Sequence, residues 1–415
     1  MLRRIWEILK SILIPVLVLN LLLLTLMALP VNITRALPLP GFLAEFIGVG
    51  PTATFQPVSQ DALTETTIPM TVSVRQGLGR ATIRRDTTTL SLVYDRFSGL
   101  FATALSSATD PVALSVSADY LKQWGVLFSY AGQIPAQALS QWLSETDGQV
   151  DGVYSQYFLA LADSQVFLYV SGRNGVTRYS TQVSQRELLA RLEEYAPDGT
   201  HLAAEVSDAV CSPFTLWESS AILSNYTAVN PLTPELKETL AELLDFNPYG
   251  AGSYTDPATG NITYTENDRS LTISKDGQVI LSAQEGSYAR FAPDGETPAD
   301  YIAAARRLLM SFYAGISSDT GSWYLYDFQE ENGVITCTFC AVLDSVPIFP
   351  AGVKVSFRNG ALTGFTATVR SFHKTGEISR LMPMEQAAAI AAPGAFIFPA
   401  YQLSAGGLNV GWQQN

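Results

Sequence analysis

The amino-acid sequence predicts an α+β fold: a single N-terminal transmembrane helix, followed by extracytoplasmic repeated units of a helix packed on antiparallel sheet. Three observations lead to this prediction. Residues 11–29 form an uncharged, apolar run near the N-terminus. Beyond it, short alternating apolar segments flank Asn-Gly and Asp-Gly pairs, which are typical of antiparallel hairpins. One order of helix and hairpins also occurs twice, as expected of a repeated unit.

The apolar run has the length of a membrane span. An α-helix rises about 1.5 Å per residue, so roughly 20 residues cross the ~30 Å hydrocarbon core of a bilayer. Backbone groups in lipid must be hydrogen-bonded within the segment, which requires a helix. We therefore predict a transmembrane helix at 11–30, preceded by a cytoplasmic tail at 1–10 and followed by a Pro-rich linker at 31–66.

A cleaved signal peptide is the alternative to an anchor. Its apolar region would span about 7–15 residues and end at a small-residue cleavage site. Here the run is longer, and the stretch 28–31, Ala-Leu-Pro-Val, offers no pair of small residues at the required spacing. The sequence therefore favours an uncleaved anchor.

The charges around the helix indicate its orientation. Arg3, Arg4 and Lys10 precede it, whereas Arg35 alone follows closely. The positive-inside rule then predicts a single-pass protein of the cell membrane, with a cytoplasmic N-terminus and an extracytoplasmic bulk. Asn20 lies midway along the helix, where its amide either contacts another transmembrane helix, worth ~0.5–2 kcal/mol, or is a tolerated polar residue.

The first outer domain is predicted at 67–228 and mixes strands with helices. A strand is expected at 71–74, where apolar and polar residues alternate. The other expected elements are a short helix at 117–124, a strand at 125–130, a helix opened by Pro135, a hairpin of 167–170 and 176–179 around Asn174-Gly175, and a helix from the capping box Ser184–Glu187 to Tyr195.

The rest of the chain contains one unit twice, at 229–290 and 291–415. Each copy begins with a helix at a Thr-Pro pair, Thr233 and Thr297, and continues with two hairpins. The second copy is longer by about ten residues, close to the stretch 341–350. The expected strands are 262–264, 271–273 and 279–281 in the first copy and 334–336, 353–357 and 362–369 in the second, before a last helix at 384–391 and a last strand at 406–412.

Composition excludes some classes of function. Hydrophobic residues make up 47% of the 415 residues and charged residues 15%, as in a packed globular protein. The formal net charge is −13. A chain this acidic is not expected to bind nucleic acid, or an anionic lipid surface, by bulk electrostatics.

The three cysteines, Cys211, Cys337 and Cys340, suggest three interpretations. The spacing of Cys337 and Cys340 matches a redox or zinc motif, but a redox pair normally opens a helix, and this one lies in an expected strand. Zinc needs further ligands, and the chain has only two histidines, His201 and His373. We therefore expect small buried hydrophobic residues or one disulfide that joins Cys211 to Cys337 or Cys340.

No catalytic motif is present. The chain contains no GxSxG, HExxH or P-loop pattern, and neither histidine lies in a recognised arrangement. The adjacent acids at 193–194 and 330–331 are typical of solvated faces. We predict no enzyme activity, no cofactor and no metal site. A hydrolase with dispersed carboxylates remains an alternative, because such carboxylates leave no local signature.

Two stretches and the overall layout resemble a known group of proteins. The first stretch is 94–98, Tyr-Asp-Arg-Phe-Ser, followed by 124–130 and by Ile134-Pro135; the second is 346–349, Val-Pro-Ile-Phe, followed by 353–364 with its Asn-Gly turn. With a basic tail, one membrane helix and repeated outer units, the chain resembles the YycH/YycI group of Firmicute regulatory proteins. The second stretch also resembles PepSY-type units.

The resemblance implies a non-enzymatic regulator of a membrane sensor histidine kinase that controls cell-wall metabolism. The transmembrane helix would contact the kinase or a related accessory protein, and the outer domain would tune the complex. No catalytic residue carries over, because the group has none. The alternative is an envelope binding or inhibitor module that acts on a secreted hydrolase or an assembly factor, as PepSY-like domains do.

Overall fold

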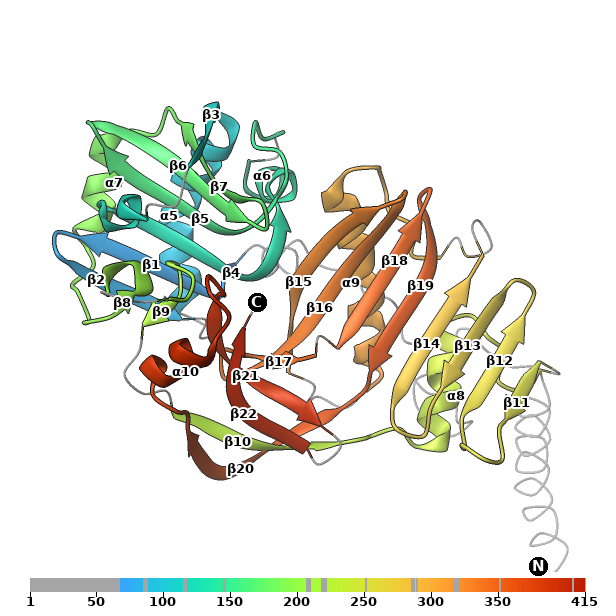
Figure 1. The fold of residues 1–415 in the computed structure, drawn as a ribbon. Helices are drawn as coiled ribbons and strands as arrows, with labels where there is room; N and C mark the ends of the chain where they lie inside the picture. The colour runs from blue at the N-terminus through green and yellow to red at the C-terminus, as the bar shows by residue number, and fades with distance from the viewer. Residues whose placement is uncertain are drawn as a thin grey trace, which may run out of the picture. The chain divides into compact units, whose positions relative to one another are not determined.

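A computed structural model describes residues 68–84, 89–114, 118–144, 147–206, 210–217, 222–250, 252–284, 288, 290–316, 321–350, 352–404 and 407–414. The predicted tail at 1–10, the transmembrane helix at 11–30 with Asn20, and the linker at 31–66 lie outside these residues. Within them, every helix is too short or too polar to cross a bilayer. The described part is a mixed α+β fold in which strands dominate, as Figure 1 shows.

The first sheet has seven antiparallel strands in the order β2-β1-β4-β5-β6-β7-β3. Its strands are β1 (Thr71–Gln76), β2 (Gly79–Arg84), β3 (Thr109–Leu114), β4 (Gly125–Pro135), β5 (Val153–Ala162), β6 (Gln165–Gly172) and β7 (Gly175–Ser180). Side chains alternate between the two faces of a strand. On β1, Val72 and Val74 therefore enter the main core, while Ser73 and Arg75 point to the opposite face.

Different elements cover the two faces of this sheet. Helices α5 (Thr89–Ser106), α6 (Ala136–Ser144) and α7 (Gln185–Leu192) bury Phe97, Leu139 and Leu188 in the main core. The other face carries a smaller core around Tyr120 and Tyr169, whose rings stack 4.7 Å apart. It is covered by η1 (Asp119–Lys122), β8 (His201–Leu202), η2 (Ala203–Glu205) and β9 (Leu216–Trp217).

One helix followed by a four-stranded meander occurs twice among the described residues. Helix α8 (Pro234–Leu243) precedes the meander β11 (Ser253–Thr255), β12 (Ile262–Glu266), β13 (Arg269–Ile273) and β14 (Gln278–Ala283). Helix α9 (Pro298–Ala314) precedes the meander β15 (Ser322–Glu331), β16 (Val334–Leu343), β18 (Val353–Arg358) and β19 (Ala361–Thr368). Antiparallel pairing of β14 with β19 joins the two meanders into one sheet (Figure 1).

The additional residues of the second copy form a short strand, β17 (Val346–Phe349), within the stretch 341–350. It pairs in parallel with β21 (Ile397–Ser404), and β21 forms a hairpin with β22 (Gly407–Gln414). Between the repeat and this hairpin lie β20 (Ser371–Arg380) and α10 (Met384–Ile390). Strand β20 pairs with β10 (Ile222–Val229) in a two-stranded ribbon.

Most local predictions are confirmed. The hairpin turn at Asn174-Gly175 joins β6 to β7, and Thr233 and Thr297 cap α8 and α9 with their side chains. Two predictions are corrected: the expected helix at 117–124 is a single 3₁₀ turn, and the helix from Ser184 ends at Leu192 rather than Tyr195. Strand β15 is among the strands that were not predicted.

The first sheet meets the repeat where β4 approaches β15. A Cβ atom on Gly132 would lie 1.5 Å from the carbonyl oxygen of Tyr326, so only glycine fits there. Nearby, Arg173 pairs with the largely buried Asp327 at 2.8 Å. Burial raises the pKa of Asp327 above its ordinary value, although Arg173 acts in the opposite direction. A tight backbone contact and an ion pair thus fix this junction.

We predict that Gly132→Ala destabilises the protein by about 1–3 kcal/mol or more, because the backbone of β15 has to move away from the added methyl group. The matched control is Gly99→Ala in α5, where an added Cβ meets nothing within 4 Å and the helix should gain up to about 1 kcal/mol. Urea unfolding followed by tryptophan fluorescence measures both changes. Equal effects of the two substitutions would contradict the close contact.

Candidate binding cleft

A cleft of about 360 Å³ lies where the first sheet, the 201–217 segment and the C-terminal hairpin meet. We call it the junction cleft. Its walls come from β1, β2 and β4, from β8 and β9, from β10, from the turn between β16 and β17, and from β21 and β22. Pockets of roughly 300–1,000 Å³ that are mostly apolar with a few placed polar groups are typical of ligand sites.

The apolar wall is rich in aromatic side chains. Phe214, Phe396, Phe398 and Trp412 line the junction cleft. Phe398 packs 5.6 Å, centroid to centroid, from Phe396, and also 5.6 Å from Phe349 of β17. These contacts hold the rings in place, so the wall presents a large, preformed apolar surface.

The polar wall belongs to the first sheet. Ser73 and Ser129 lie on neighbouring strands, β1 and β4, and Thr71 precedes Ser73 on the same strand face. Arg84, at the end of β2, pairs in register with Thr71 and also lines the cleft. The face that carries these groups is the one opposite the main core, so strand alternation places them in the cleft.

Asp344 and Ser345 stand across the cleft, in the tight turn between β16 and β17. Lys374 of β20 donates to the Asp344 carboxylate at 2.8 Å. Burial acts to raise the pKa of Asp344, but hydrogen bonds from Lys374, Tyr226 and Ser224 outweigh it and leave the pKa below its ordinary value. The carboxylate is therefore ionised and engaged with Lys374 at neutral pH.

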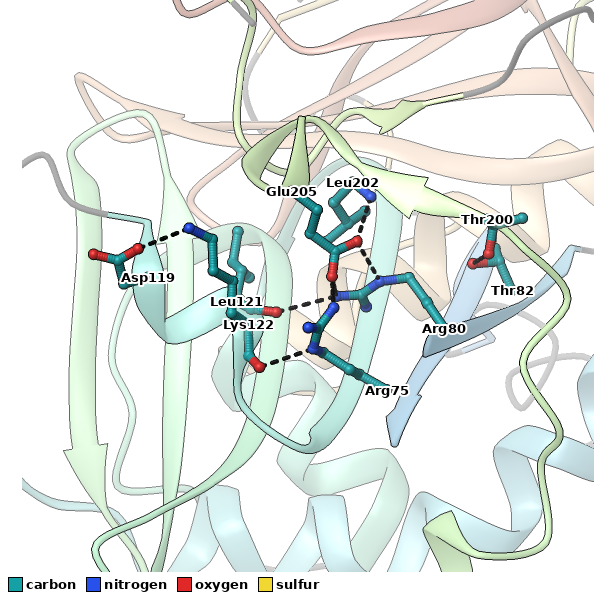
Figure 2. Close-up of polar contacts among 9 residues, drawn as sticks. All are labelled: Arg75, Arg80, Thr82, Asp119, Leu121, Lys122, Thr200, Leu202 and Glu205. Carbon is teal, nitrogen blue, oxygen red and sulfur yellow. Dashed lines mark hydrogen bonds and ion pairs between the residues drawn. The ribbon is translucent and has the colours of Figure 1, made fainter. Parts of the chain in front are cut away.

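A buried ionic network holds one wall of the cleft in place (Figure 2). We call it the Glu205 network. The Glu205 carboxylate forms ion pairs with Arg75 and Arg80, which face each other on β1 and β2. It also accepts from the backbone N–H of Leu202 at 2.8 Å. The network therefore fixes the 201–217 segment to the β1–β2 hairpin. Because Leu202 lines the cleft, this also fixes part of the cleft wall.

The two arginines find further acceptors on η1. Arg80 Nη2 donates to the carbonyl oxygen of Leu121 at 3.1 Å, and Arg75 Nε donates to that of Lys122 at 2.8 Å (Figure 2). Burial, together with neighbouring Arg75, lowers the pKa of Arg80 to about 9, so the side chain stays protonated at neutral pH. Two buried cations thus depend on one carboxylate.

The predicted cysteine site is dispersed. Cys337 and Cys340 are fully buried on β16, and Cys211 lies in a separate small core with Met384. Among the described residues no disulfide joins these cysteines, so the disulfide considered from the sequence is not formed. Cys337 and Cys340 are three residues apart in a strand, roughly 10 Å, beyond disulfide reach. Burial raises the pKa of Cys337 and of Cys211 above the ordinary value, which keeps both thiols protonated.

The other groups considered from the sequence lie on the surface. His201 and His373 are exposed, on β8 and β20. The acids at 193–194 and 330–331 are also exposed. Among the residues that the structure describes, no group of three or more His, Cys, Asp or Glu side chains is placed to hold a metal ion.

Sequence reasoning missed the junction cleft and the Glu205 network. One signal was available: Arg75, Arg80 and Arg84 flank a Gly77-Leu-Gly79 turn in an acidic chain, which indicates a hairpin with a basic face. Glu205 gives no such signal, because its two arginine partners are more than a hundred residues away.

Comparison of the chain with models of protein families, with curated proteins and with solved structures finds no match in any of the three.

We predict that Glu205→Gln destabilises the protein by about 3 kcal/mol or more, because it leaves Arg75 and Arg80 buried without a counter-charge. The control is Glu194→Gln, whose pair with Arg96 is about half exposed and should contribute less than about 1 kcal/mol. Urea denaturation of both variants makes the comparison. A Glu205→Gln variant as stable as the Glu194→Gln control would rule out a stabilising role for the Glu205 network.

A second prediction concerns pH. The pKa of Asp344 lies below its ordinary value of 3.8 in the folded chain. Its contribution to stability is therefore complete above the unfolded value and is lost as pH falls through the native pKa. The stability difference between wild type and Asp344→Asn should shrink as pH is lowered from about 5 to about 2. Unfolding free energies measured across this range would show it, and a constant difference would count against the prediction.

Proposed function

We propose that this protein is a membrane-anchored, extracytoplasmic regulator that acts by contact, with a segment of a partner bound in the junction cleft. The cleft is the observation that supports the proposal most directly. Its walls come from the first sheet, the 201–217 segment and the C-terminal hairpin. A partner bound in the cleft contacts all three of these parts. If it binds one arrangement of the parts more tightly than another, it shifts the population toward that arrangement.

The chemistry of the lining supports recognition rather than reaction. Arg84, Asp344 and Tyr130 are its titratable groups. The Asp344 carboxylate is engaged with Lys374, and burial raises the pKa of Tyr130 well above its ordinary value. A side chain that titrates near neutral pH serves best as a general acid or base. Arg84 and Asp344 instead offer fixed charges, and Tyr130 is buried in the main core.

A sensor histidine kinase of the same membrane is the partner that we propose first. The proposal rests on the resemblance of the layout to the YycH/YycI group and on the transmembrane helix predicted at 11–30. The second candidate is a secreted hydrolase or an assembly factor. The stretch 346–364 favours it, because its sequence resembles PepSY-type units.

Crosslinking in native membranes tests the proposal. A photoreactive phenylalanine analogue would replace Phe398 in the cleft, Leu21 in the predicted membrane helix, and the exposed Tyr249 as a control. Mass spectrometry then identifies what is attached. A sensor kinase captured at Leu21 and Phe398 supports the regulator, and a hydrolase or assembly factor captured at Phe398 alone supports the second candidate. Equal capture of the same proteins at Tyr249 and Phe398 would contradict a role for the cleft.

The membrane contact yields a separate prediction. Asn20→Leu removes the amide that would bond to a helix of the kinase, worth ~0.5–2 kcal/mol, so co-purification should fall roughly two- to thirtyfold. Leu21→Ile, which preserves the apolar character of the helix, is the matched control. Quantitative pull-down of the kinase from solubilised membranes is the measurement, and unchanged recovery with Asn20→Leu would exclude the contact.

A further inference from the structure

We infer that the junction cleft binds an uncharged peptide segment with apolar side chains and discriminates against peptides that would place a charge in it. The inference rests on the proposed function, in which the cleft is a partner-binding site. It adds the chemical class of the ligand and the property by which the cleft rejects other peptides.

The apolar character of the ligand follows from the aromatic wall. Phe214 is buried, whereas Phe396, Phe398 and Trp412 are half-buried. The indole of Trp412 is further held by a hydrogen bond from its Nε1 to the carbonyl oxygen of Met382, at 2.9 Å. Rings that are already fixed lose little conformational freedom on binding, so they suit apolar side chains of a ligand.

The charged side chains of the lining already have counter-charges. Arg84 and Asp344 are the charged residues among those that line the cleft. Lys374 donates to the Asp344 carboxylate at 2.8 Å. Burial lowers the pKa of Arg84, and the nearby Asp198 carboxylate acts in the opposite direction. A charged ligand group would therefore lose its hydration in the cleft without finding an unengaged counter-charge, which is costly.

The hydroxyl groups favour a peptide over a lipid chain. Thr71 and Ser129 pair in register on β1 and β4, Ser73 lies two residues further along the same face, and Ser345 lies across the cleft. Polar groups are thus distributed along the cleft. An acyl chain would cover these hydroxyls without offering hydrogen bonds, at a cost for each buried group. A peptide carries an N–H and a C=O at nearly every residue and can pair with them.

The test uses the full-length protein in lipid nanodiscs and three peptides that carry an uncharged dye. They are acetyl-Leu-Val-Gln-Phe-Leu-amide and its versions with Glu or Lys in place of Gln. Fluorescence anisotropy should show about tenfold tighter binding of the Gln peptide than of either charged peptide.

Lys374→Met tests the balance of charges directly. It leaves the Asp344 carboxylate without its cation, so the Lys peptide should bind about tenfold more tightly to this variant than to the wild type. A misfolded variant would not gain affinity in this way. The matched control is Lys354→Met, an exposed lysine on β18 outside the cleft lining, which should leave all three affinities unchanged.

The contribution of the peptide backbone is measured with a further ligand, the Gln peptide with esters in place of its two central amides. The esters preserve the shape of the chain but remove two N–H donors. This ligand should bind about two- to tenfold more weakly than the Gln peptide.

Any of four results would overturn the inference. The first is the absence of saturable binding by the Gln peptide, and the second is equal or tighter binding of a charged peptide to the wild type. The third is no gain for the Lys peptide with Lys374→Met. The fourth is equal binding of the ester ligand, which would mean that the cleft accepts apolar groups of any kind, a lipid chain included.

These results are distinct from a failure of the proposed function. If crosslinking at Phe398 still captures a protein partner, the proposed function stands and only the ligand class fails. If the Gln peptide is preferred but no partner is captured at Phe398, the regulator proposal fails and the ligand class stands.

Discussion

The Glu205 carboxylate lies between two buried guanidinium groups, and the way in which the chain from Leu202 onward covers the first sheet depends on it. Arg75 and Arg80 sit on adjacent strands and would repel each other in a dry environment without it. The same carboxylate receives the Leu202 amide, so the chain that leaves the first sheet is tied back onto that sheet. From this point the segment continues through Phe214 and Leu216 to the wall of the junction cleft and then to β10.

The second constraint is the pairing of β14 with β19, which turns two meanders into one sheet. Each meander buries its apolar face under its own helix, α8 or α9. Because β14 and β19 pair with each other, neither strand is left with an unpaired edge in the middle of the sheet. The insertion that forms β17 breaks the symmetry of the two copies. It offers a strand to which the C-terminal hairpin attaches, and the aromatic wall of the cleft follows from that attachment.

Sequence patterns predicted what is decided locally. Gly175 and Gly360 adopt positive φ in their turns, and the threonines before α8 and α9 accept hydrogen bonds from the helix backbone. These features depend on residues a few positions apart. The two helix-and-meander runs share an order of elements because the same local signals recur in the same order in the sequence.

The features that the sequence did not predict depend on contacts between residues far apart in the chain. Strand β15 lacks a clear period of two because both of its faces are largely buried, with β4 packed close to it. The expected helix at 117–124 shortens to a 3₁₀ turn whose carbonyl oxygens accept from Arg75 and Arg80. The cleft combines residues from Met70 to Trp412, so no window of the sequence contains it.

The ribbon of β10 and β20 has a consequence for the order of assembly. Ile222 pairs with Arg380, and Tyr401 donates to the carbonyl oxygen of Ser224, 177 positions away in the chain. Closing so long a loop is entropically costly until the chain between has condensed. Loop-closure entropy therefore favours formation of the repeat sheet before the ribbon and the C-terminal hairpin close the cleft. The junction cleft is complete only when the last strand, which carries Trp412, is in place, so a molecule that binds there reports a completed fold.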